Sequence, residues 1–276
     1  MNPRAVRSRA AVPGPRAADV APAPRDLVVV KLGGTTVAEQ DHVLEEIVTV
    51  AAEVDVVVVH GGGKRLSEWL ERLGVESRFE HGLRVTDDAA LEVAVAVLRG
   101  VVNSELVAAL RHHGGDAVGL SGVDGGLLEG ERIEGLGRVA TIAAVRPSVI
   151  YALLAAGMLP VVASFALDGD GVICNVNADD AAAGLAAGLD ATLVLLTDTD
   201  GVRRADGTRI AELTAEEAER LIEDGVITGG MVPKVRSAAR GLARRGSVAV
   251  IADGRMPGAV ARALSPDPAS GTRVRA

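Results

Sequence analysis

The stretch Leu27-Val28-Val29-Val30-Lys31-Leu32-Gly33-Gly34 decides the fold. Its first four residues form a short, continuous aliphatic run, which is typical of a strand buried on both faces of a parallel sheet. The run leads directly into a lysine and two glycines. Ligands of open α/β sheets bind at the carboxyl ends of the strands, where glycine N–H groups can approach an anion closely. The stretch indicates a buried strand that ends in an anion site, although a tight turn with a solvated lysine would also fit it.

The same pattern recurs along the chain and predicts an α/β fold. Further strands are expected at Val56–Val59, Val161–Ala163, Leu193–Leu196 and Val248–Ile251. Amphipathic stretches between them predict helices over Val43–Ala52, Leu66–Leu73, Ala89–His113, Ser148–Gly157, Asp179–Gly188, Ala215–Asp224 and Val235–Gly246. Alternating strands and helices favour a three-layer αβα sandwich with a mainly parallel central sheet. The glycine-rich residues 117–145 have weaker periodicity and could form hairpins or lids over a site.

Composition indicates a globular cytoplasmic protein. Hydrophobic residues make up 48% of the 276 residues and aromatic residues only 1%, so the core must be aliphatic. No run approaches the ~18 uninterrupted apolar residues of a membrane helix, and the N-terminus lacks the apolar segment of a secretory signal. The single cysteine, Cys174, excludes an internal disulfide framework. A net charge of −8 argues against a general nucleic-acid binder but allows a local basic pocket.

Residues Met1–Arg25 differ in composition from the rest of the chain. They are rich in Arg, Ala and Pro, and the prolines at 13, 15, 22 and 24 forbid a continuous helix. We expect a disordered tail, with a partner-binding arm as the alternative. Residues 26–276 are then expected to form a single domain.

A second glycine loop also follows directly after an aliphatic run. The run Val56–Val59 is followed by His60-Gly61-Gly62-Gly63. Three successive glycines carry a large entropic penalty that a simple turn does not require. The loop is not a P-loop, because no G-x-x-x-x-G-K-[ST] frame fits. Gly135-Leu136-Gly137-Arg138-Val139-Ala140 loosely matches a dinucleotide fingerprint, but no apolar strand precedes it.

Three later segments also place small or polar residues at the ends of elements. They are Asn175-Val176-Asn177-Ala178-Asp179, Thr197-Asp198-Thr199-Asp200-Gly201 and Gly229-Gly230-Met231-Val232-Pro233-Lys234. The first opens a helix, so one of its polar side chains should be the helix cap. In the last, a glycine pair leads a lysine into the start of another helix. Together the five segments favour a polyanion site.

Taken in order, these segments resemble the amino acid kinase family, and within it most closely the acetylglutamate kinases. The matching segments are Lys31–Gly34, His60–Gly63, Gly82–Asp87, Asn175–Asp179, Thr197–Gly201 and Gly230–Lys234. The resemblance spans roughly residues 27–272. The glycine loops are common to the whole family, whereas the Arg84 segment and the Asn175–Asp179 run together are specific to the acetylglutamate branch.

The resemblance implies that ATP and N-acetyl-L-glutamate give ADP and N-acetyl-L-glutamyl 5-phosphate, the second step of arginine synthesis. A carboxylate with a pKa near ~4 is already ionised at neutral pH, so the reaction needs no general base. The obstacle is repulsion between the carboxylate and the polyphosphate. Catalysis should therefore consist mainly of positioning and charge neutralisation during in-line transfer.

The resemblance also implies a role for each site residue. Lys31 would stabilise the transferred phosphoryl group, Lys234 would act on the leaving side of ATP, and Asp179 would hold both lysines charged and aimed. Substrate binding would use Gly62, Gly63, Arg84 and Asn175. ATP binding would use Gly33, Gly34, Thr197, Asp198, Gly201, Gly230 and Met231.

Mg²⁺ would arrive with ATP and need few protein ligands of its own. We expect residues 26–165 to form a lobe for the acid and for dimerisation, and residues 166–276 a lobe for ATP. Besides these substrates and a second copy of the chain, neither nucleic acid nor a membrane is expected as a partner.

This sequence departs from the family pattern at several positions. Thr35 and Thr36 stand where many members carry Asn-Ala, and Lys64-Arg65 stand where many carry Pro-Gln. Members inhibited by arginine have an N-terminal helix that links dimers into hexamers, and a His and a Glu near the C-terminus. Here the tail is Pro-rich, and Gly258 and Ala263 occupy those two places. We therefore expect a homodimer without arginine feedback.

Two other functions remain open from the sequence. One is a kinase for aminoadipate or glutamate bound to an acidic carrier protein in lysine synthesis, which Ser121-Gly122-Val123-Asp124-Gly125 would also suit. The other is a non-catalytic ligand sensor on the same fold. The presence of Lys31, Asp179 and Lys234 favours a kinase over a sensor, and the Gly82–Asp87 segment favours the acetylglutamate branch over the carrier-dependent branch and over UMP and carbamate kinases.

Overall fold

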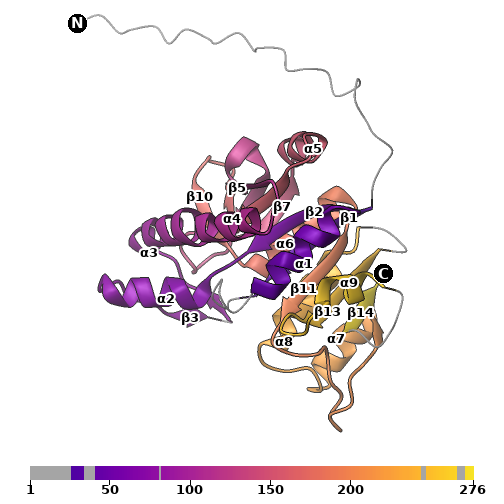
Figure 1. Ribbon diagram of the computed structural model, residues 1–276. Coiled ribbons are helices and arrows are strands. Elements are labelled where there is room, and N and C mark those ends of the chain that lie inside the picture. The colour runs from indigo at the N-terminus through magenta and orange to yellow at the C-terminus, as the bar shows by residue number, and fades with distance from the viewer. Residues whose placement is uncertain (1–25, 34–40, 81, 244–246, 266–270) are drawn as a thin grey trace, which may run out of the picture.

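An eight-stranded sheet forms the centre of the protein, seen here in a computed structural model that describes residues 26–33, 41–80, 82–243, 247–265 and 271–276 (Figure 1). The strand order is β12-β14-β13-β11-β1-β2-β8-β5. The bounds are β1 (Leu27–Leu32), β2 (Asp55–His60), β5 (Ala117–Ser121), β8 (Leu159–Ala163), β11 (Thr192–Thr197), β12 (Glu212–Thr214), β13 (Val248–Asp253) and β14 (Thr272–Arg275). The strands from β13 to β5 are all parallel, and β14 runs antiparallel to β13. The predicted tail, residues 1–25, lies outside the described residues.

Helices cover both faces of this sheet, as the alternation of side chains along its strands requires. In β1, Val28 and Val30 pack in one core cluster, and Val29 packs in the cluster on the opposite face. The first face is covered by α1 (Asp41–Ala51), α4 (Asn103–His112) and α9 (Ala259–Leu264). The second is covered by α5 (Ser148–Ala155), α6 (Ala178–Leu189), α7 (Ala215–Glu223) and α8 (Met231–Arg240). The predicted three-layer αβα architecture with a mainly parallel sheet is confirmed.

One long helix runs from Asp88 to His112 and contains a π-helical segment. It consists of α3 (Asp88–Ala94), the π-helix η2 (Val95–Val102) and α4. Its 25 residues are long and apolar enough, by length and composition alone, to cross a membrane. In this fold it packs on the sheet and on α2 (Gly63–Arg72), and Asn103 on it donates a hydrogen bond to the carbonyl of Val161 in β8. It therefore serves as a core helix of the folded chain.

A second, smaller sheet is built in part from residues 117–145, the region that the sequence left undecided. β6 (Leu128–Arg132), β7 (Val139–Val145), β9 (Phe165–Leu167) and β10 (Ile173–Val176) close on themselves in the order β10-β7-β6-β9. β5, from the same glycine-rich region, is instead the edge strand of the main sheet. The short hairpin β3 (Phe79–Glu80) and β4 (Leu83–Arg84) follows α2. The region 117–145 is thus partly a hairpin and partly a strand of the core.

Candidate active site

Lys31, Asp179 and Lys234 meet in one ionic cluster. The ammonium nitrogen of Lys31 lies 2.7 Å from Oδ1 of Asp179, and that of Lys234 lies 2.9 Å from Oδ2 of the same carboxylate. Lys31 is 7% exposed and Asp179 5% exposed, whereas 23% of the Lys234 side chain is exposed. A single buried carboxylate thus bridges two cations that come from β1 and α8.

The alternation of side chains along β1 and the positions of α6 and α8 explain why these three residues lie together. Lys31 is two residues after Val29 in β1, so its side chain points to the face covered by α6. Asp179 lies in the first turn of α6, two residues after the cap Asn177, whose side chain accepts a hydrogen bond from the Asp179 N–H. Lys234 lies in the first turn of α8, which packs against α6. The cluster therefore forms where three separate elements converge.

Burial and mutual attraction shift the pKa values of Asp179 and Lys31. Burial alone would raise the pKa of Asp179, but Lys31 and Lys234 outweigh it and hold that pKa below its usual value. Burial lowers the pKa of Lys31, and the carboxylate of Asp179 opposes this effect. Asp179 is therefore ionised at neutral pH and stabilises the charged form of its buried neighbour Lys31.

The glycine loop after β2 lies against the start of α6. A Cβ atom on Gly61 would sit 3.2 Å from Cβ of Ala178, the residue before Asp179. Gly62 has a φ of 146°, and a Cβ atom there would come within 2.7 Å of Leu98 in η2. Only glycine fits such a conformation and such a close approach. The loop after β1 passes equally close to β11, because a Cβ atom on Gly33 would lie 3.3 Å from the carbonyl oxygen of Leu196.

Arg84 points at the same glycine loop. One of its terminal nitrogens donates to the carbonyl of Gly63 at 3.1 Å and to the hydroxyl of Ser67 at 2.7 Å, and the other donates to the hydroxyl of Ser77. The guanidinium carbon lies 4.5 Å from the centre of the Phe79 ring. Burial lowers the pKa of Arg84, which is nevertheless charged at any physiological pH. The structure therefore aims a planar cation at the start of α2.

Asn175 in β10 is connected to Arg84 through Thr86. Its amide donates to the Thr86 hydroxyl at 3.2 Å, and that hydroxyl donates to the carbonyl of Arg84 at 2.9 Å. Thr86 is completely buried. Arg84 and Asn175, the two side chains that the resemblance assigns to the acid, are thus linked by a series of hydrogen bonds through Thr86.

Several residues predicted for ATP lie at the end of β11 and the start of α8. Thr197 ends β11, and its hydroxyl donates to the exposed carboxylate of Asp198 at 3.1 Å. Gly230 is the N-terminal cap of α8, and Met231 is the first residue of that helix and packs partly on the core. Lys234 lies three residues after Met231 in the same helix. Gly34, together with Thr35 and Thr36, lies outside the described residues.

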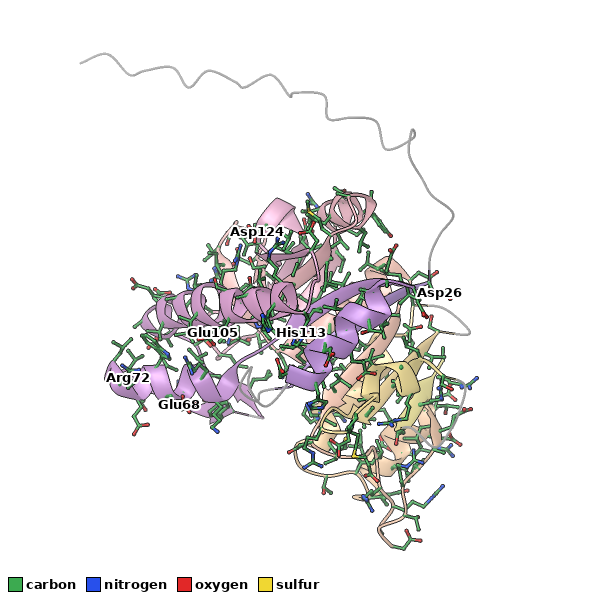
Figure 2. The ribbon with its side chains drawn as sticks, viewed as in Figure 1. Asp26, Glu68, Arg72, Glu105, His113 and Asp124 are labelled. Carbon is green, nitrogen blue, oxygen red and sulfur yellow. The ribbon has the colours of Figure 1, made fainter. Side chains whose placement is uncertain are left out.

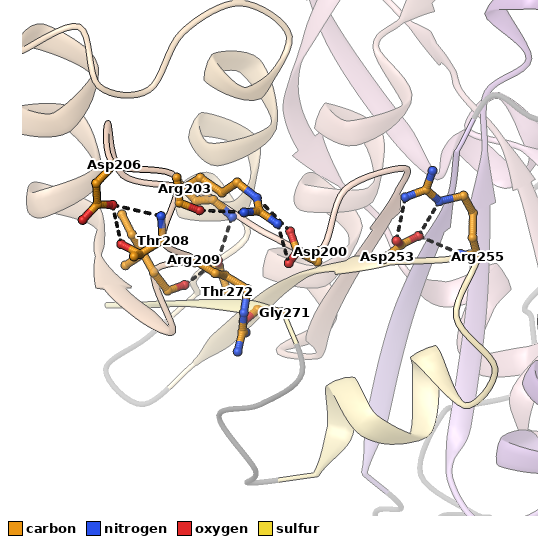
Figure 3. Close-up of polar contacts among 12 residues, drawn as sticks. Asp200, Arg203, Asp206, Thr208, Arg209, Asp253, Arg255, Gly271 and Thr272 are labelled. Atoms are coloured by element: carbon orange, nitrogen blue, oxygen red, sulfur yellow. Dashed lines mark hydrogen bonds and ion pairs between the residues drawn. The ribbon is translucent and has the colours of Figure 1, made fainter.

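Gly201, which was also predicted for the ATP site, packs closely against Thr272 of β14. A Cβ atom on Gly201 would come within 2.5 Å of the Thr272 hydroxyl, so glycine is required where this turn touches β14. That hydroxyl accepts a hydrogen bond from Val202 N–H and donates to the carbonyl of Ile210. Figure 3 shows the surrounding ion pairs, in which Arg203 grips Asp200 and, separately, Arg255 grips Asp253.

Sequence reasoning missed several residues that the structure places at the site. Ser67 and Ser77 hold the Arg84 guanidinium, and Thr86 links Arg84 to Asn175. Thr86 belongs to the segment that carried the resemblance, but nothing in the spacing of the two serines indicated a role. Of the two basic residues that depart from the family pattern, Lys64 is exposed and Arg65 pairs with Glu105 of α4 at 3.2 Å. The side chain of Arg65 is therefore engaged with α4.

The arrangement suits the binding and transfer of an anionic group. Two lysines meet Asp179 at the start of α6, which adds the positive end of its dipole. The second glycine loop, which Arg84 contacts at Gly63, packs against the same helix start. Among the described residues, no three His, Cys, Asp or Glu side chains gather as a metal site. The cationic side chains and backbone donors can supply electrostatic stabilisation and positioning.

Comparison with known proteins agrees with this geometry. The model of the amino acid kinase family matches residues 26–253. Acetylglutamate kinase from Geobacillus kaustophilus (strain HTA426) is 48% identical over 216 residues, which is 76% of this chain and 83% of that protein. Acetylglutamate kinase from Thermosynechococcus vestitus is 43% identical over 258 residues, which is 89% of this chain and 87% of that protein.

Solved structures agree on the fold. The protein smu.665 from Streptococcus mutans UA159 superposes with a TM-score of 0.77 at 28% identity and covers 91% of this chain and 98% of its own. Carbamate kinase from Giardia lamblia superposes with a TM-score of 0.65 at 16% identity, covering 92% of this chain and 99% of its own, which shows the fold alone. The resemblance seen in the sequence is confirmed. The chain belongs to the amino acid kinase family.

Proposed function

We propose that the protein transfers the γ-phosphoryl group of ATP to the side-chain carboxylate of N-acetyl-L-glutamate, giving ADP and N-acetyl-L-glutamyl 5-phosphate, as in arginine biosynthesis. The observation that carries the proposal is the position of Arg84, whose guanidinium reaches the carbonyl of Gly63 in the second glycine loop. A planar fork at this point can grip a dicarboxylic acid through one carboxylate. The names of the relatives that are 43–48% identical point to the same acid.

In the proposed reaction the acid needs no activation by a base. A carboxylate oxygen attacks the γ-phosphorus and forms the new P–O bond, while the bond to the β–γ bridging oxygen breaks and its electron pair leaves with ADP. Lys31 neutralises charge on the transferred group, and Lys234 neutralises charge on the leaving side. Asp179 holds both lysines in place from its position between them. Gly33, Gly34 and Gly62 donate N–H groups to phosphoryl oxygens.

Mg²⁺ is proposed to enter with ATP. The carboxylate of Asp179 already pairs with two lysines, which fits a metal ion held mainly by phosphate oxygens and water. When bound, it would neutralise part of the polyphosphate charge. Residues 26–165 carry Arg84 and the Gly63 loop and would bind the acid, whereas residues 166–276 carry Thr197, Gly230 and Met231 and would bind ATP.

The experiment that tests the proposed function is a hydroxylamine trap for acyl phosphate, with ATP, Mg²⁺ and a panel of acids. We expect hydroxamate with N-acetyl-L-glutamate, and at least 100-fold less kcat/KM with glutamate, N-acetylaspartate or α-aminoadipate. An acidic carrier protein charged with aminoadipate or glutamate completes the panel. Hydroxamate only with the charged carrier would replace the proposed substrate by the carrier-bound acid.

We also propose a homodimer in the cytoplasm. An apolar groove of about 500 Å³ runs beside the partly exposed side of α3 and η2 and includes Leu91, Val95, Ala96 and Ile173 in its lining. A second copy of the chain would cover these side chains. Feedback by arginine is not part of the proposal, because Gly258 and Ala263 stand at the two places where arginine-inhibited members of the family carry a His and a Glu.

A further inference from the structure

His60, the last residue of β2, is a buried histidine that the proposed chemistry does not use. It is 2% exposed and directly precedes the glycine loop. Its Nδ1 lies 2.8 Å from the carbonyl oxygen of Gly61, and its Nε2 lies 2.9 Å from the amide nitrogen of Asn103 in α4. Both ring nitrogens are therefore engaged inside the protein.

The partners of His60 determine its tautomer. A carbonyl oxygen can only accept, so Nδ1 carries the proton and donates to Gly61. Asn103 presents its NH₂ group to Nε2, because that group also donates to the Val161 carbonyl at 2.9 Å while its Oδ1 accepts from Arg99 at 3.2 Å. Burial lowers the pKa of His60 to about 4, so the ring is neutral at physiological pH.

This hydrogen bond also fixes the direction of a backbone donor. The carbonyl of Gly61 and the N–H of Gly62 belong to one planar trans peptide unit and point in opposite directions. Holding the carbonyl towards the imidazole therefore turns the Gly62 N–H away from the ring. Three successive glycines have no side chains of their own to hold such an orientation, so an external group must supply it.

The π-helix η2 holds the same peptide from a second side. Leu98 and Val102 lie so close to Gly62 that a Cβ atom there would meet them at 2.7 and 3.3 Å. Arg99 of η2 holds the amide of Asn103 and also donates to the carbonyl of Gly119 in β5 at 3.2 Å. π-Helical segments occur often at functional sites.

The network ends at the carboxyl end of β5. The Arg99 guanidinium lies 3.7 Å from the carboxylate of Asp124, which accepts hydrogen bonds from the backbone N–H and the hydroxyl of Ser121. In Figure 2 Asp124 lies on the same side of the molecule as the long helix that carries Glu105. One connected network thus joins the end of β2, the middle of β8 and the end of β5.

We propose that His60, held by Asn103, is a positioning residue that fixes the Gly61–Gly62 peptide so that the Gly62 N–H donates to the transferred phosphoryl group. This inference rests on the proposed function, since it assigns the orientation of one donor in that reaction. If it holds, fast phosphoryl transfer requires His60 to be the neutral tautomer with a proton on Nδ1, although His60 does not touch the reacting groups.

Two substitutions separate the two hydrogen bonds of the ring. Asn places an amide nitrogen near the position of Nδ1, so His60→Asn can still donate to Gly61 but cannot reach Asn103. Gln places its oxygen near the position of Nε2, so His60→Gln can still accept from Asn103 but does not hold the Gly61 carbonyl. His112→Gln, at an exposed position of α4, makes the same chemical change away from the site and serves as the control.

The experiment measures kcat, both KM values and the free energy of unfolding in urea for the three variants. We expect His60→Gln to lower kcat roughly 100-fold, as the loss of one oriented backbone donor does, with both KM values changed less than about threefold. His60→Asn should keep kcat within about tenfold of the unmodified protein and yet be the less stable variant, because Asn103 loses an acceptor. His112→Gln should match the unmodified protein.

A merely structural histidine would give the opposite order, with activity following stability. Equal losses of kcat in the two His60 variants, or a larger loss in His60→Asn, would overturn the inference while the unmodified protein remained an active kinase. An unmodified protein that formed no acyl phosphate would instead overturn the proposed function, and the inference with it. Nitrogen NMR of the unmodified protein tests the tautomer without any variant: a protonated Nδ1 between pH 6 and 8 is expected, and a protonated Nε2 would overturn the inference.

Discussion

Asp179 is the side chain that connects the two halves of the candidate site. Its two oxygens pair with lysines from different elements, and all three residues were predicted from the sequence because each lies at the end of a strand or the start of a helix. The contacts of Ser67, Ser77 and Thr86 could not be predicted in the same way. Hydroxyl groups are common on loops and helices, and their partners come from distant parts of the chain.

Replacement of Lys31 should separate catalysis from stability. We expect Lys31→Met to lower kcat at least 1,000-fold and to destabilise the fold by about 3 kcal/mol, because it leaves the buried Asp179 carboxylate with one partner. Adding Asp179→Asn should restore most of the stability and none of the activity. Steady-state kinetics and urea unfolding measure both effects. A double variant that regained activity would show that Lys31 acts only as a counter-ion.

Arg84 should determine the affinity for the acid. We expect Arg84→Lys to raise the KM for the acid at least tenfold and to change the KM for ATP less than twofold, because an ammonium group lacks the planar fork. Ser67→Ala, which removes one partner of the guanidinium, should raise the same KM by a smaller factor. Initial-rate kinetics with each substrate varied measure this. An increase confined to the KM for ATP would move Arg84 to the nucleotide side.

At the level of elements, the aliphatic runs predicted the buried strands well. All five expected strands lie within β1, β2, β8, β11 and β13, because continuous β-branched runs have few alternatives to a buried strand. The short strands of the closed sheet and the six-residue helix α9 were missed. Segments of only three to seven residues carry too little periodicity to be recognised. Helix α8 was expected at Val235–Gly246 and begins earlier, at Met231, since proline is tolerated in a first helical turn.

The contact between the second glycine loop and η2 should be sensitive to a single methyl group. We expect Gly62→Ala to destabilise the protein by about 3 kcal/mol, because its φ of 146° strains any other residue and the new methyl group meets Leu98. Gly63→Ala is the matched control, since no atom lies within 4 Å of its new Cβ atom. It should change stability by less than about 1 kcal/mol. Urea unfolding distinguishes the two, and equal effects would contradict the described loop geometry.

At the scale of the whole molecule, stability should fall as the solution is acidified below neutral pH. His60 has its pKa lowered from 6.5 to about 4 in the folded chain. Between these values the unfolded chain binds a proton that the folded chain does not, so acidification favours unfolding, by roughly 3 kcal/mol in full. The effect of Asp179 on the free energy of unfolding changes with pH only below its usual pKa of 3.8, so it does not overlap with the pH range in which His60 acts. Urea unfolding between pH 7 and 4.5 should show the slope, and His60→Gln should lack that component; an unchanged slope would assign the effect to other groups.

The proposed dimer makes its own prediction for the molecule as a whole. A charge in the apolar groove beside α3 and η2 would be buried by the second copy of the chain, which is unfavourable. We therefore expect Ala96→Glu to convert the dimer into a monomer. Thr49→Glu, at an exposed position of α1, should leave the dimer intact. Sedimentation velocity of the unmodified protein and both variants measures this. A dimer that persists in Ala96→Glu would place the interface elsewhere.

The central claim is that this α/β sheet gathers two lysines, an arginine and glycine loops in order to transfer a phosphoryl group to the carboxylate of acetylglutamate. Phosphorus NMR of the reaction with ATP and Mg²⁺ tests it most directly, because an acyl phosphate and ADP have separate resonances. The account predicts that both appear together, in equal amounts, only when N-acetyl-L-glutamate is present, and that neither appears with Lys31→Met. Release of inorganic phosphate without an acyl phosphate, or equal turnover of unacetylated glutamate, would contradict it.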